Sequence, residues 1–244
     1  MTQKVPSASL AATAYSAVRR RILRGELTLG QAISRRKLAA ELGISFPPVT
    51  EALLRLELEG LLESRPRAGT RVRIPSRDDV FGHYVVREAL EAQAAVLCAE
   101  RATRIERREL RKLAERVDIL AAREDRSTYV AQHLKLHRRI ADCARCEPLT
   151  TAVERTQALA SIWFCLMRKP SPQDSTSRHQ ELVEAILGGN VAQVTAAVKE
   201  HLAVGRQRTL EVLEPYFRLR KSRGARFHRT DKNLGALPVV GVRH

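Results

Sequence analysis

The chain has 244 residues, enough for two modest domains, and a formal net charge of +16. It has no uninterrupted run of about 18 apolar residues and no basic start followed by an apolar run, so we predict no transmembrane helix, no signal peptide and no membrane partner. Its four cysteines are too few for a disulfide scaffold. We interpret them as small buried residues in a cytoplasmic protein, while the CxxC spacing of Cys143 and Cys146 leaves a zinc or redox role open.

The positive charge is gathered at the two ends of the chain. Residues 1–76 hold 13 Lys and Arg against 6 Asp and Glu, and residues 216–244 hold 8 against 1. The middle, residues 77–215, is nearly balanced at 22 against 20, as expected of a packed domain. Clustered positive charge favours a polyanionic partner, because binding releases counterions from phosphates.

Three short helices are predicted near the N-terminus. The first is about Ser9–Arg24, where apolar residues recur at helical spacing. Ser34 can cap a second helix, Arg35–Glu41, and Gly43 supplies the left-handed conformation that ends it. Ser45 is expected to cap the third helix. Pro47 and Pro48 are tolerated in its first turn, and its apolar stripe consists of Val49, Ala52, Leu53 and Leu56.

A basic hairpin is predicted directly after the third helix, which Gly60 ends. Leu61–Glu63 and Thr70–Ile74 read as short strands, and the turn between them adds arginines to those of the second strand. Three helices followed by such a hairpin indicate a winged helix-turn-helix that binds DNA. The alternative is a small helical domain with a solvated basic surface. We place the end of this domain at residue 76, because Pro75 stops the strand and Ser76 or Asp78 can cap a new helix.

The rest of the chain, residues 77–220, is predicted to be an all-helical bundle of about six helices, so the fold class is mainly α. After Arg220 the sequence is basic, contains glycine and lacks periodicity, so residues 221–244 are expected to be a disordered tail. A loop is expected at Pro170–Pro172. The expected helices are Val80–Ala102, Ile105–Arg123, Ser127–Cys146, Pro148–Met167, Ser175–Leu187 and Val191–Arg220.

These motifs together resemble a known family. The N-terminal part is similar to the DNA-binding domain of GntR-type transcriptional regulators, and the helical part is similar to the FCD domain of their FadR subgroup. Both halves occur in the family order over about residues 10–215. The first half of the resemblance rests on Ile22–Leu27, Leu38–Ser45, Pro48–Leu53, Leu56–Leu61 and Gly69. The second half rests on Arg87–Glu91, His137–Ala141, His179, Ala185–Asn190 and His201-Leu202.

The resemblance implies where DNA would be contacted, and the departures from it concern base preference. Family members usually carry arginine where this chain has Phe46 and Thr50, threonine in place of Pro47, and proline in place of Leu29. An arginine there can read a base or clamp a phosphate, so we expect an operator unlike the family's usual one, or weaker binding. The DNA-binding residues that we predict are Arg35, Arg36, Ser45, Phe46, Thr50, Gly69 and Arg71.

Four histidines of the helical part are candidate metal ligands. His133 and His137 are four residues apart in one predicted helix and share a face, which is a common way to chelate a metal. His179 and His201 lie on later helices, and inward residues of facing helices can converge. In the FCD pattern the matching positions form a divalent metal site, with aspartate where this chain has His133. Four imidazoles favour Zn²⁺, Ni²⁺ or Cu²⁺ over metals that prefer oxygen, and we expect Zn²⁺ or Ni²⁺. The alternative is that these histidines have structural roles; His83 is read in that way, or as exposed.

The resemblance also implies an effector. In similar proteins an arginine at the position of Arg87 pairs with an effector carboxylate, which a guanidinium binds well in a bidentate manner. The alternative is a helix-surface ion pair with Glu91. We therefore predict a ligand-responsive homodimer that binds a double-stranded DNA operator, with a small organic acid held near the metal.

Two other functions are alternatives to this prediction. One is a nonspecific nucleic-acid-binding protein that relies on the basic tail. The other is a metal-dependent enzyme. Position 134 is Leu, where the zincin-like spacing of His133 and His137 would need a glutamate as general base, so we expect no enzyme.

Overall fold

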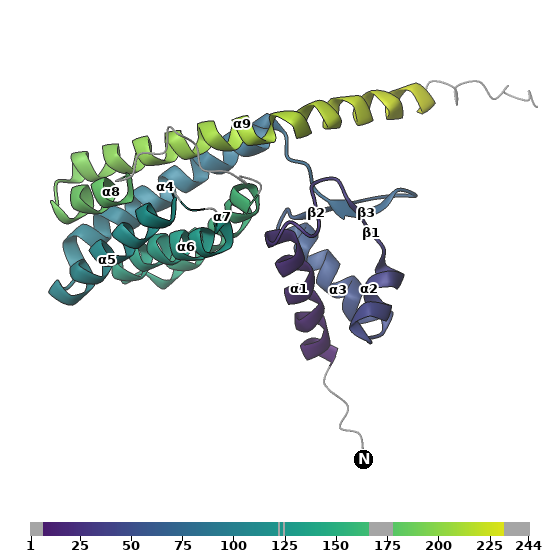
Figure 1. The fold of residues 1–244 in the computed structure, drawn as a ribbon, viewed down its shortest axis with the longest axis horizontal. Coiled ribbons are helices and arrows are strands. Elements are labelled where there is room, and N and C mark those ends of the chain that lie inside the picture. The colour runs from purple at the N-terminus through teal and green to yellow at the C-terminus, as the bar shows by residue number, and fades with distance from the viewer. Residues whose placement is uncertain (1–6, 122, 124, 166–177, 232–244) are drawn as a thin grey trace, which may run out of the picture.

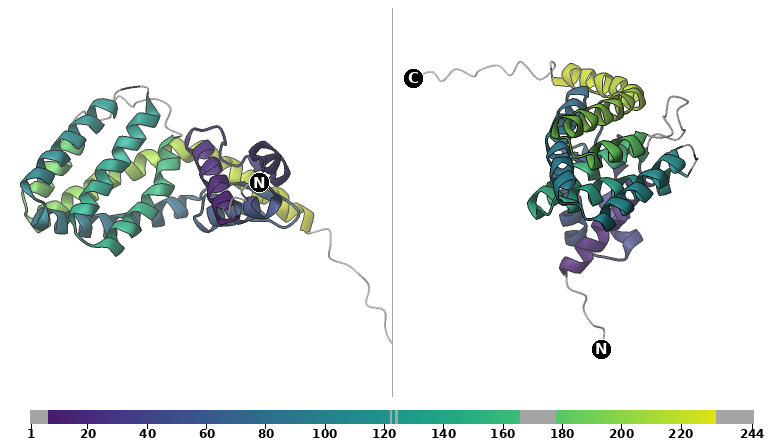
Figure 2. Two further views of the ribbon diagram at one scale, coloured as in Figure 1. Left: turned by 90° about the horizontal axis from the view of Figure 1, so that it is seen from below. Right: turned by 90° about the vertical axis from the view of Figure 1, so that its left-hand side faces the viewer.

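The structure is a computed structural model, and it describes residues 7–121, 123, 125–165 and 178–231. A small unit of three helices and a sheet lies beside a larger helical bundle (Figures 1 and 2). The small unit contains α1 (Ser7–Leu23), β1 (Ala32–Ile33), α2 (Arg35–Leu42), α3 (Phe46–Leu58), β2 (Leu62–Arg65) and β3 (Gly69–Val72). The bundle contains α4 (Arg77–Arg101), α5 (Arg104–Ala121), α6 (Arg126–Cys143), α7 (Glu147–Cys165), α8 (Arg178–Leu187) and α9 (Val191–Asp231).

The turn between α2 and α3 forms largely as the sequence predicts. The Ser34 hydroxyl accepts a hydrogen bond from the backbone N–H of Lys37 at 3.2 Å, and Gly43 ends α2 with φ of 63°. Ser45 occupies the N-cap position of α3 but makes no capping hydrogen bond with its side chain, contrary to expectation. The reason is that an N-cap hydroxyl accepts from the second or third helical residue, and these are Pro47 and Pro48, which have no N–H.

The hairpin belongs to a three-stranded antiparallel sheet in the order β1-β3-β2. β2 and β3 pair with Ser64 opposite Thr70 and Arg65 opposite Gly69. The sequence did not indicate β1, because it has only two residues, Ala32 and Ile33. By pairing with Arg71 and Thr70 it ties the segment before α2 to the wing.

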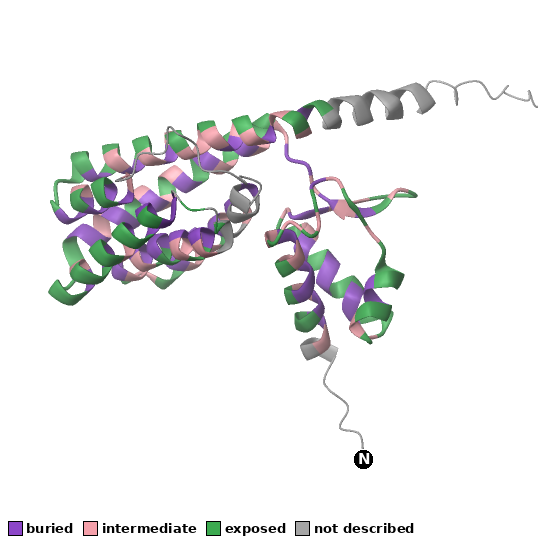
Figure 3. Ribbon diagram, in the orientation of Figure 1, coloured by how far each residue is buried: buried purple, intermediate pink, exposed green. Residues whose placement is uncertain are grey.

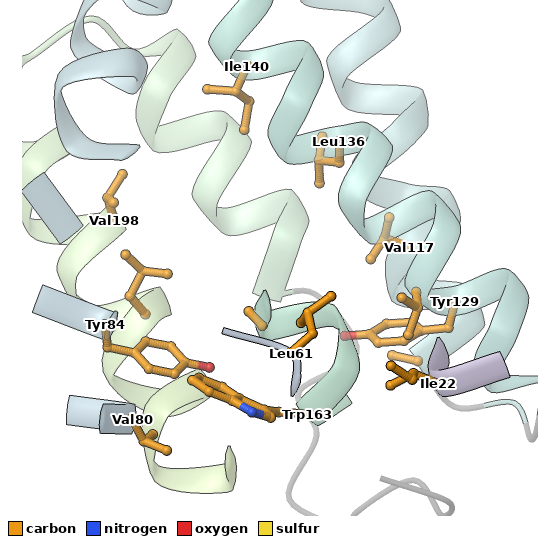
Figure 4. Close-up of a cluster of buried hydrophobic side chains, with 14 of the residues drawn as sticks. Ile22, Leu61, Val80, Tyr84, Val117, Tyr129, Leu136, Ile140, Trp163 and Val198 are labelled. Atoms are coloured by element: carbon orange, nitrogen blue, oxygen red, sulfur yellow. The ribbon is translucent and has the colours of Figure 1, made fainter. Parts of the chain in front are cut away.

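The bundle begins where Ser76 caps α4. Its hydroxyl accepts from the N–H of Asp79, and the Asp79 carboxylate accepts from the N–H of Ser76, so both orphan donors are satisfied. α4 packs against α6, α7 and α9, and α5 packs against α6 and α8. The buried sides of these helices face one another, with exposed residues outside (Figure 3). Core residues such as Val117, Leu136, Ile140 and Val198 fill the interior (Figure 4). The predicted mainly α fold is thus confirmed.

The C-terminal segment corrects one expectation. α9 continues to Asp231, so the expected disorder from residue 221 onward is wrong for residues 221–231. These residues include Gly224 but no proline, and Arg, Lys and Ala favour a helix even without apolar periodicity. Residues 232–244 lie outside the described part of the chain. So do the expected loop at Pro170–Pro172, the last two residues of the helix expected at Pro148–Met167 and the first three of the one expected at Ser175–Leu187.

The two units touch directly. α1 packs against α7, and Arg73 beyond β3 forms an ion pair with Asp79 of α4 at 2.8 Å. Gly60 lies at this seam with φ of 76°, and a Cβ there would be 3.3 Å from Nη1 of Arg73 and 4.0 Å from Leu159 of α7. A glycine therefore allows both the turn after α3 and the close approach. No helix in the described ranges has the length and apolar character that crossing a membrane requires.

Candidate metal centre and DNA-reading surface

The structure brings the four predicted histidines together inside the bundle. His133 and His137 lie on α6, His179 lies in the first turn of α8 and His201 lies on α9. One possible ligand atom from each lies within 4.8 Å of all the others. Two nitrogens on opposite sides of a bound ion would be about 4 Å apart, because each metal–nitrogen bond is about 2.1 Å. The cluster is therefore close to the size that one ion requires.

Two buried carboxylates orient this cluster. Asp118 of α5 lies 2.6 Å from Nδ1 of His179, and Glu91 of α4 lies 2.8 Å from Nδ1 of His137. A carboxylate accepts a hydrogen bond from Nδ1–H, which leaves the lone pair of a neutral imidazole on Nε2. In both rings Nε2 is buried without a hydrogen-bond partner among the described residues, as is Nδ1 of His201. Buried polar atoms without a partner are uncommon, and here they fit a bound metal ion.

Burial favours the neutral form of three imidazoles, those of His133, His179 and His201. Desolvation lowers the pKa of His133 and of His201 well below the ordinary value, and the neighbouring histidines add to the effect. Burial also lowers the pKa of His179, although Asp118 opposes the shift. Metal ligands must be unprotonated, so low pKa values favour metal binding. The sequence did not indicate Asp118, because it lies 61 residues before the histidine that it orients.

Arg87 is not on the helix surface. It is buried, and its Nε donates to Glu91 at 2.7 Å, so the ion pair with Glu91 exists but lies in the interior. Burial alone would raise the pKa of Glu91, but the Arg87 guanidinium and His137 hold it at about 2. Nη1 of Arg87 has no hydrogen-bond partner among the described residues. An unused N–H donor therefore remains beside the histidine cluster.

A small cavity joins Arg87 to the histidines. Its volume is about 20 Å³, which is room for about one water molecule or ion. Arg178 and Arg208 also contribute to its lining, so the cavity is rich in positive charge. The remaining lining residues are Tyr84, Tyr129, His133, His179, His201, Leu202 and Gly205.

Most residues predicted to contact DNA lie on the surface of the small unit. Arg35, Arg36, Ser45, Phe46, Thr50 and Gly69 are exposed. Arg35 donates to the Thr70 hydroxyl at 3.2 Å, which links α2 to the wing, and Gly69 has φ of 72° in the wing turn. Arg71 is half-buried, and its Nε lies 3.8 Å from Oε1 of Glu63. Of the predicted DNA contacts it is therefore the one whose side chain is least accessible to DNA.

The N-terminus of α3 is poor in hydrogen-bond donors. Helix N-termini often bind phosphate through free backbone N–H groups, but Pro47 and Pro48 lack this group. The Thr50 hydroxyl donates to the carbonyl of Phe46 at 3.1 Å, and Phe46 is 49% exposed. The start of this helix therefore offers apolar contact surface and the Ser45 hydroxyl.

Cys98, Cys143 and His83 lie outside the histidine cluster, among packed side chains. Cys98 and Cys143 are buried, as expected of small interior residues, whereas Cys146 is half-buried and the side chain of Cys165 lies outside the described part of the chain. His83 packs edge-on against Trp163 with ring centroids 5.0 Å apart, and desolvation lowers its pKa to about 4. His83 lies outside the histidine cluster, in line with the structural reading given to it.

A winged helix-turn-helix joined to a helical domain is an architecture typical of DNA-binding transcription regulators. The comparisons with known proteins agree. Residues 10–72 match the bacterial regulatory proteins of the gntR family, and residues 83–204 match the FCD domain. The chain belongs to the GntR family of sequence-specific transcription regulators, as the resemblance implied.

Individual relatives are regulators as well. The "Probable D-xylose utilization operon transcriptional repressor" of Paenarthrobacter nicotinovorans is 30% identical over 183 residues, 75% of this chain and 80% of that protein. The HTH-type transcriptional repressor RspR of Escherichia coli is 23% identical over 203 residues, 82% of this chain and 89% of that protein. The solved structure of Escherichia coli McbR/YncC matches with a TM-score of 0.66 at 20% identity, over 88% of this chain and all of that one. At this identity the match shows the fold alone.

Proposed function

We propose that this regulator is a repressor whose operator affinity depends on a divalent metal and a small organic acid bound in the helical domain. The observation that carries the proposal is the interior site, where unpartnered nitrogens of His137, His179 and His201 lie near an unused N–H of Arg87. Repression is proposed because two relatives carry that description. The protein would act in the cytoplasm, where an operator is accessible.

The metal that we propose is Zn²⁺ or Ni²⁺. His133, His137, His179 and His201 would hold it, and these ligands suit borderline metals better than Mg²⁺ or Ca²⁺. A bound ion would supply a fixed positive charge inside the bundle. Asp118 and Glu91 would keep two imidazoles in the orientation in which Nε2 can bind.

The effector would be a small carboxylate anchored by Arg87. The guanidinium is held by Glu91 and lies 5.0 Å from the Tyr84 ring, so its direction is fixed before a ligand arrives. The cavity of about 20 Å³ has room for about one water molecule, so the neighbouring side chains must move to admit even a small acid. That movement is a physical route from effector binding to a change in the bundle.

A homodimer would convert that change into altered DNA affinity. Phe81, Val85 and Val86 form an exposed apolar strip on α4, and Val204 is exposed on the adjacent α9, so this face is suited to a second copy. Two copies would place two α3 helices in successive major grooves of a palindromic site, and the effector would alter their spacing. A strictly monomeric protein at working concentration would contradict this mechanism.

Titration calorimetry of the metal-loaded protein with a panel of mono-, di- and tricarboxylates tests the effector site. At least one acid should bind, and Arg87→Lys should weaken it by about tenfold or more while metal content stays unchanged. Lysine keeps a charge beside Glu91 but loses the fork, so the fold should survive. If no acid releases or absorbs heat, or if Arg87→Lys binds as well as the wild type, the effector proposal is wrong.

A competition assay tests operator binding. Specific regulation requires that an operator fragment outcompete random DNA, whereas equal competition would favour the nonspecific alternative. Phe46→Arg with Thr50→Arg should shift the selected sequence toward the family's usual site, because arginine can read bases bidentately. An unchanged preference would show that these positions do not set it.

A further inference from the structure

A cleft of about 750 Å³ lies between the two units of the chain. One wall comes from α1 and α3 and includes Tyr15, Arg19 and Arg55. The other wall comes from α4 and α7 and includes His83 and Arg155. Small-molecule sites usually have volumes of about 300–1,000 Å³, so this cleft is of that size, whereas the cavity beside the histidines is not.

The charges of the cleft are unevenly compensated. Its two carboxylates already have partners: Glu59 accepts from the Tyr15 hydroxyl at 2.7 Å, and Glu154 lies 2.8 Å from Arg138. Arg19 and Arg155 form no ion pair with another described residue. One of these arginines belongs to the DNA-reading unit and the other to the bundle. Their charge is therefore available to a single anion between them.

The cleft also has an apolar part and a neutral polar group. Leu58, Leu61 and Leu159 contribute to the lining, and the Leu58 side chain is among the most exposed apolar side chains described. The imidazole of His83 donates a hydrogen bond to the backbone of Thr156, and its buried Nε2 has no hydrogen-bond partner among the described residues. A ligand here would meet apolar surface beside positive charge.

We propose that this cleft is a second ligand site, which binds an organic anion with an apolar body and thereby joins the DNA-reading unit to the helical domain. The site is separate from the histidine cluster. It also lies at the C-terminal end of α3, whereas the predicted DNA contacts lie at the N-terminal end, so DNA and this ligand can bind together. A ligand held by Arg19 and Arg155 would fix the angle between the units, on which DNA binding depends.

Fluorescence titration of the full-length protein with 1-anilinonaphthalene-8-sulfonate tests this proposal, because that probe is an organic anion with an apolar body. Trp163 is the only tryptophan and packs against His83, so quenching of its emission provides a second signal near the cleft. Arg19→Gln and Arg155→Gln should each weaken probe binding by about tenfold or more, and Arg155→Lys should weaken it less. Arg108→Gln, an exposed arginine of α5 away from the cleft, should have no effect.

The results of this titration distinguish the cleft from the apolar strip of α4 and from the histidine cluster. If Arg19→Gln and Arg155→Gln bind the probe as tightly as the wild type does, or no more weakly than Arg108→Gln, the proposal is overturned. It is also overturned if only Phe81→Ser reduces binding, because the probe then occupies the exposed strip of α4. Removal of metal with a chelator should leave probe affinity unchanged. A failure of the metal site and a failure of the cleft would thus be distinguished.

Discussion

The histidine cluster and the DNA-reading surface differ in how far contacts within the chain fix the positions of their side chains. Three of the four histidines in the cluster are buried, and Asp118 and Glu91 set the direction of two of the rings. The reading surface is exposed, and one of its few fixed side-chain contacts is that of Arg35 with Thr70. Contacts within the chain thus hold the side chains of the cluster, whereas most side chains of the predicted DNA-reading surface are exposed.

This difference explains which substitutions each region tolerates. A histidine in place of the aspartate usual at position 133 leaves four possible ligand atoms close together, so the proposed site would bind a different metal rather than lose metal binding. At the start of α3, Phe46 and Thr50 in place of arginines leave the buried stripe intact. The fold therefore persists there while the chemistry offered to DNA changes.

Removing a ligand from the cluster should have the largest effect. His137→Ala should lower zinc affinity by more than the roughly 10–100-fold that loss of a ligand's hydrogen-bond partner costs. A competition titration with a chromophoric chelator measures this. His83→Gln is the matched control, because His83 is also largely buried but lies outside the cluster. Equal losses in the two variants would show that the metal is not bound by the cluster.

Changing an orienting carboxylate should have a smaller effect. Asp118→Asn keeps the shape of the side chain but removes the charge that holds Nδ1 of His179, so zinc affinity should fall by about 10–100-fold. Asp142→Asn on α6 is the control, because Asp142 lies near Arg138 and not near the cluster. The same competition titration measures this. If Asp118→Asn binds zinc as tightly as the wild type does, Asp118 stabilises the start of α8 and does not orient a metal ligand.

Sequence patterns predicted the parts of the molecule that local rules determine. Helical spacing identified the buried stripe of α3, and the pairing of Ser34 with Gly43 located the turn. The four histidines were found because two share one helix face and the family resemblance supplied the others. The failures have physical causes as well. The N-cap at Ser45 lacks its hydrogen bond because prolines follow, and β1 is too short to show alternation.

Long-range contacts could not be predicted in this way. Asp118 contacts His179 only because α5 and α8 pack together, and the periodicity of the sequence does not predict this contact. The four-residue spacing of Arg87 and Glu91 is also compatible with an ion pair on the surface of a helix, and only the packing of the bundle shows that Arg87 is buried. The cleft between the units likewise depends on how α1 and α7 meet.

The pH dependence of stability should distinguish a buried histidine outside the cluster from an exposed one. The pKa of His83 is about 4 in the folded protein and near 6.5 in the unfolded chain, so the unfolded chain binds its proton first. Stability is therefore lost as the pH falls from 6.5 toward 4, by at most about 1.4 kcal/mol per pH unit for this group. His133, His179 and His201 act in the same direction in metal-free protein.

Urea denaturation of chelator-treated protein at pH 7 and pH 5 isolates the contribution of His83. His83→Gln should lose less stability over this interval than the wild type does, because both retain the other three histidines. Equal losses would mean that His83 is accessible to protons in the folded state.

The smallest effect is expected on the reading surface, where single contacts with phosphate are weak and independent. Arg36→Ala should weaken DNA binding a few-fold for every sequence and reduce the slope of log affinity against log salt by about 1. Arg108→Ala, on the exposed face of α5, should leave the slope unchanged. A loss confined to one DNA sequence would instead identify Arg36 as a base reader. In that case the DNA-reading surface, although exposed, would hold at least one side chain in a fixed direction. The two regions would then differ less in how firmly their side chains are positioned.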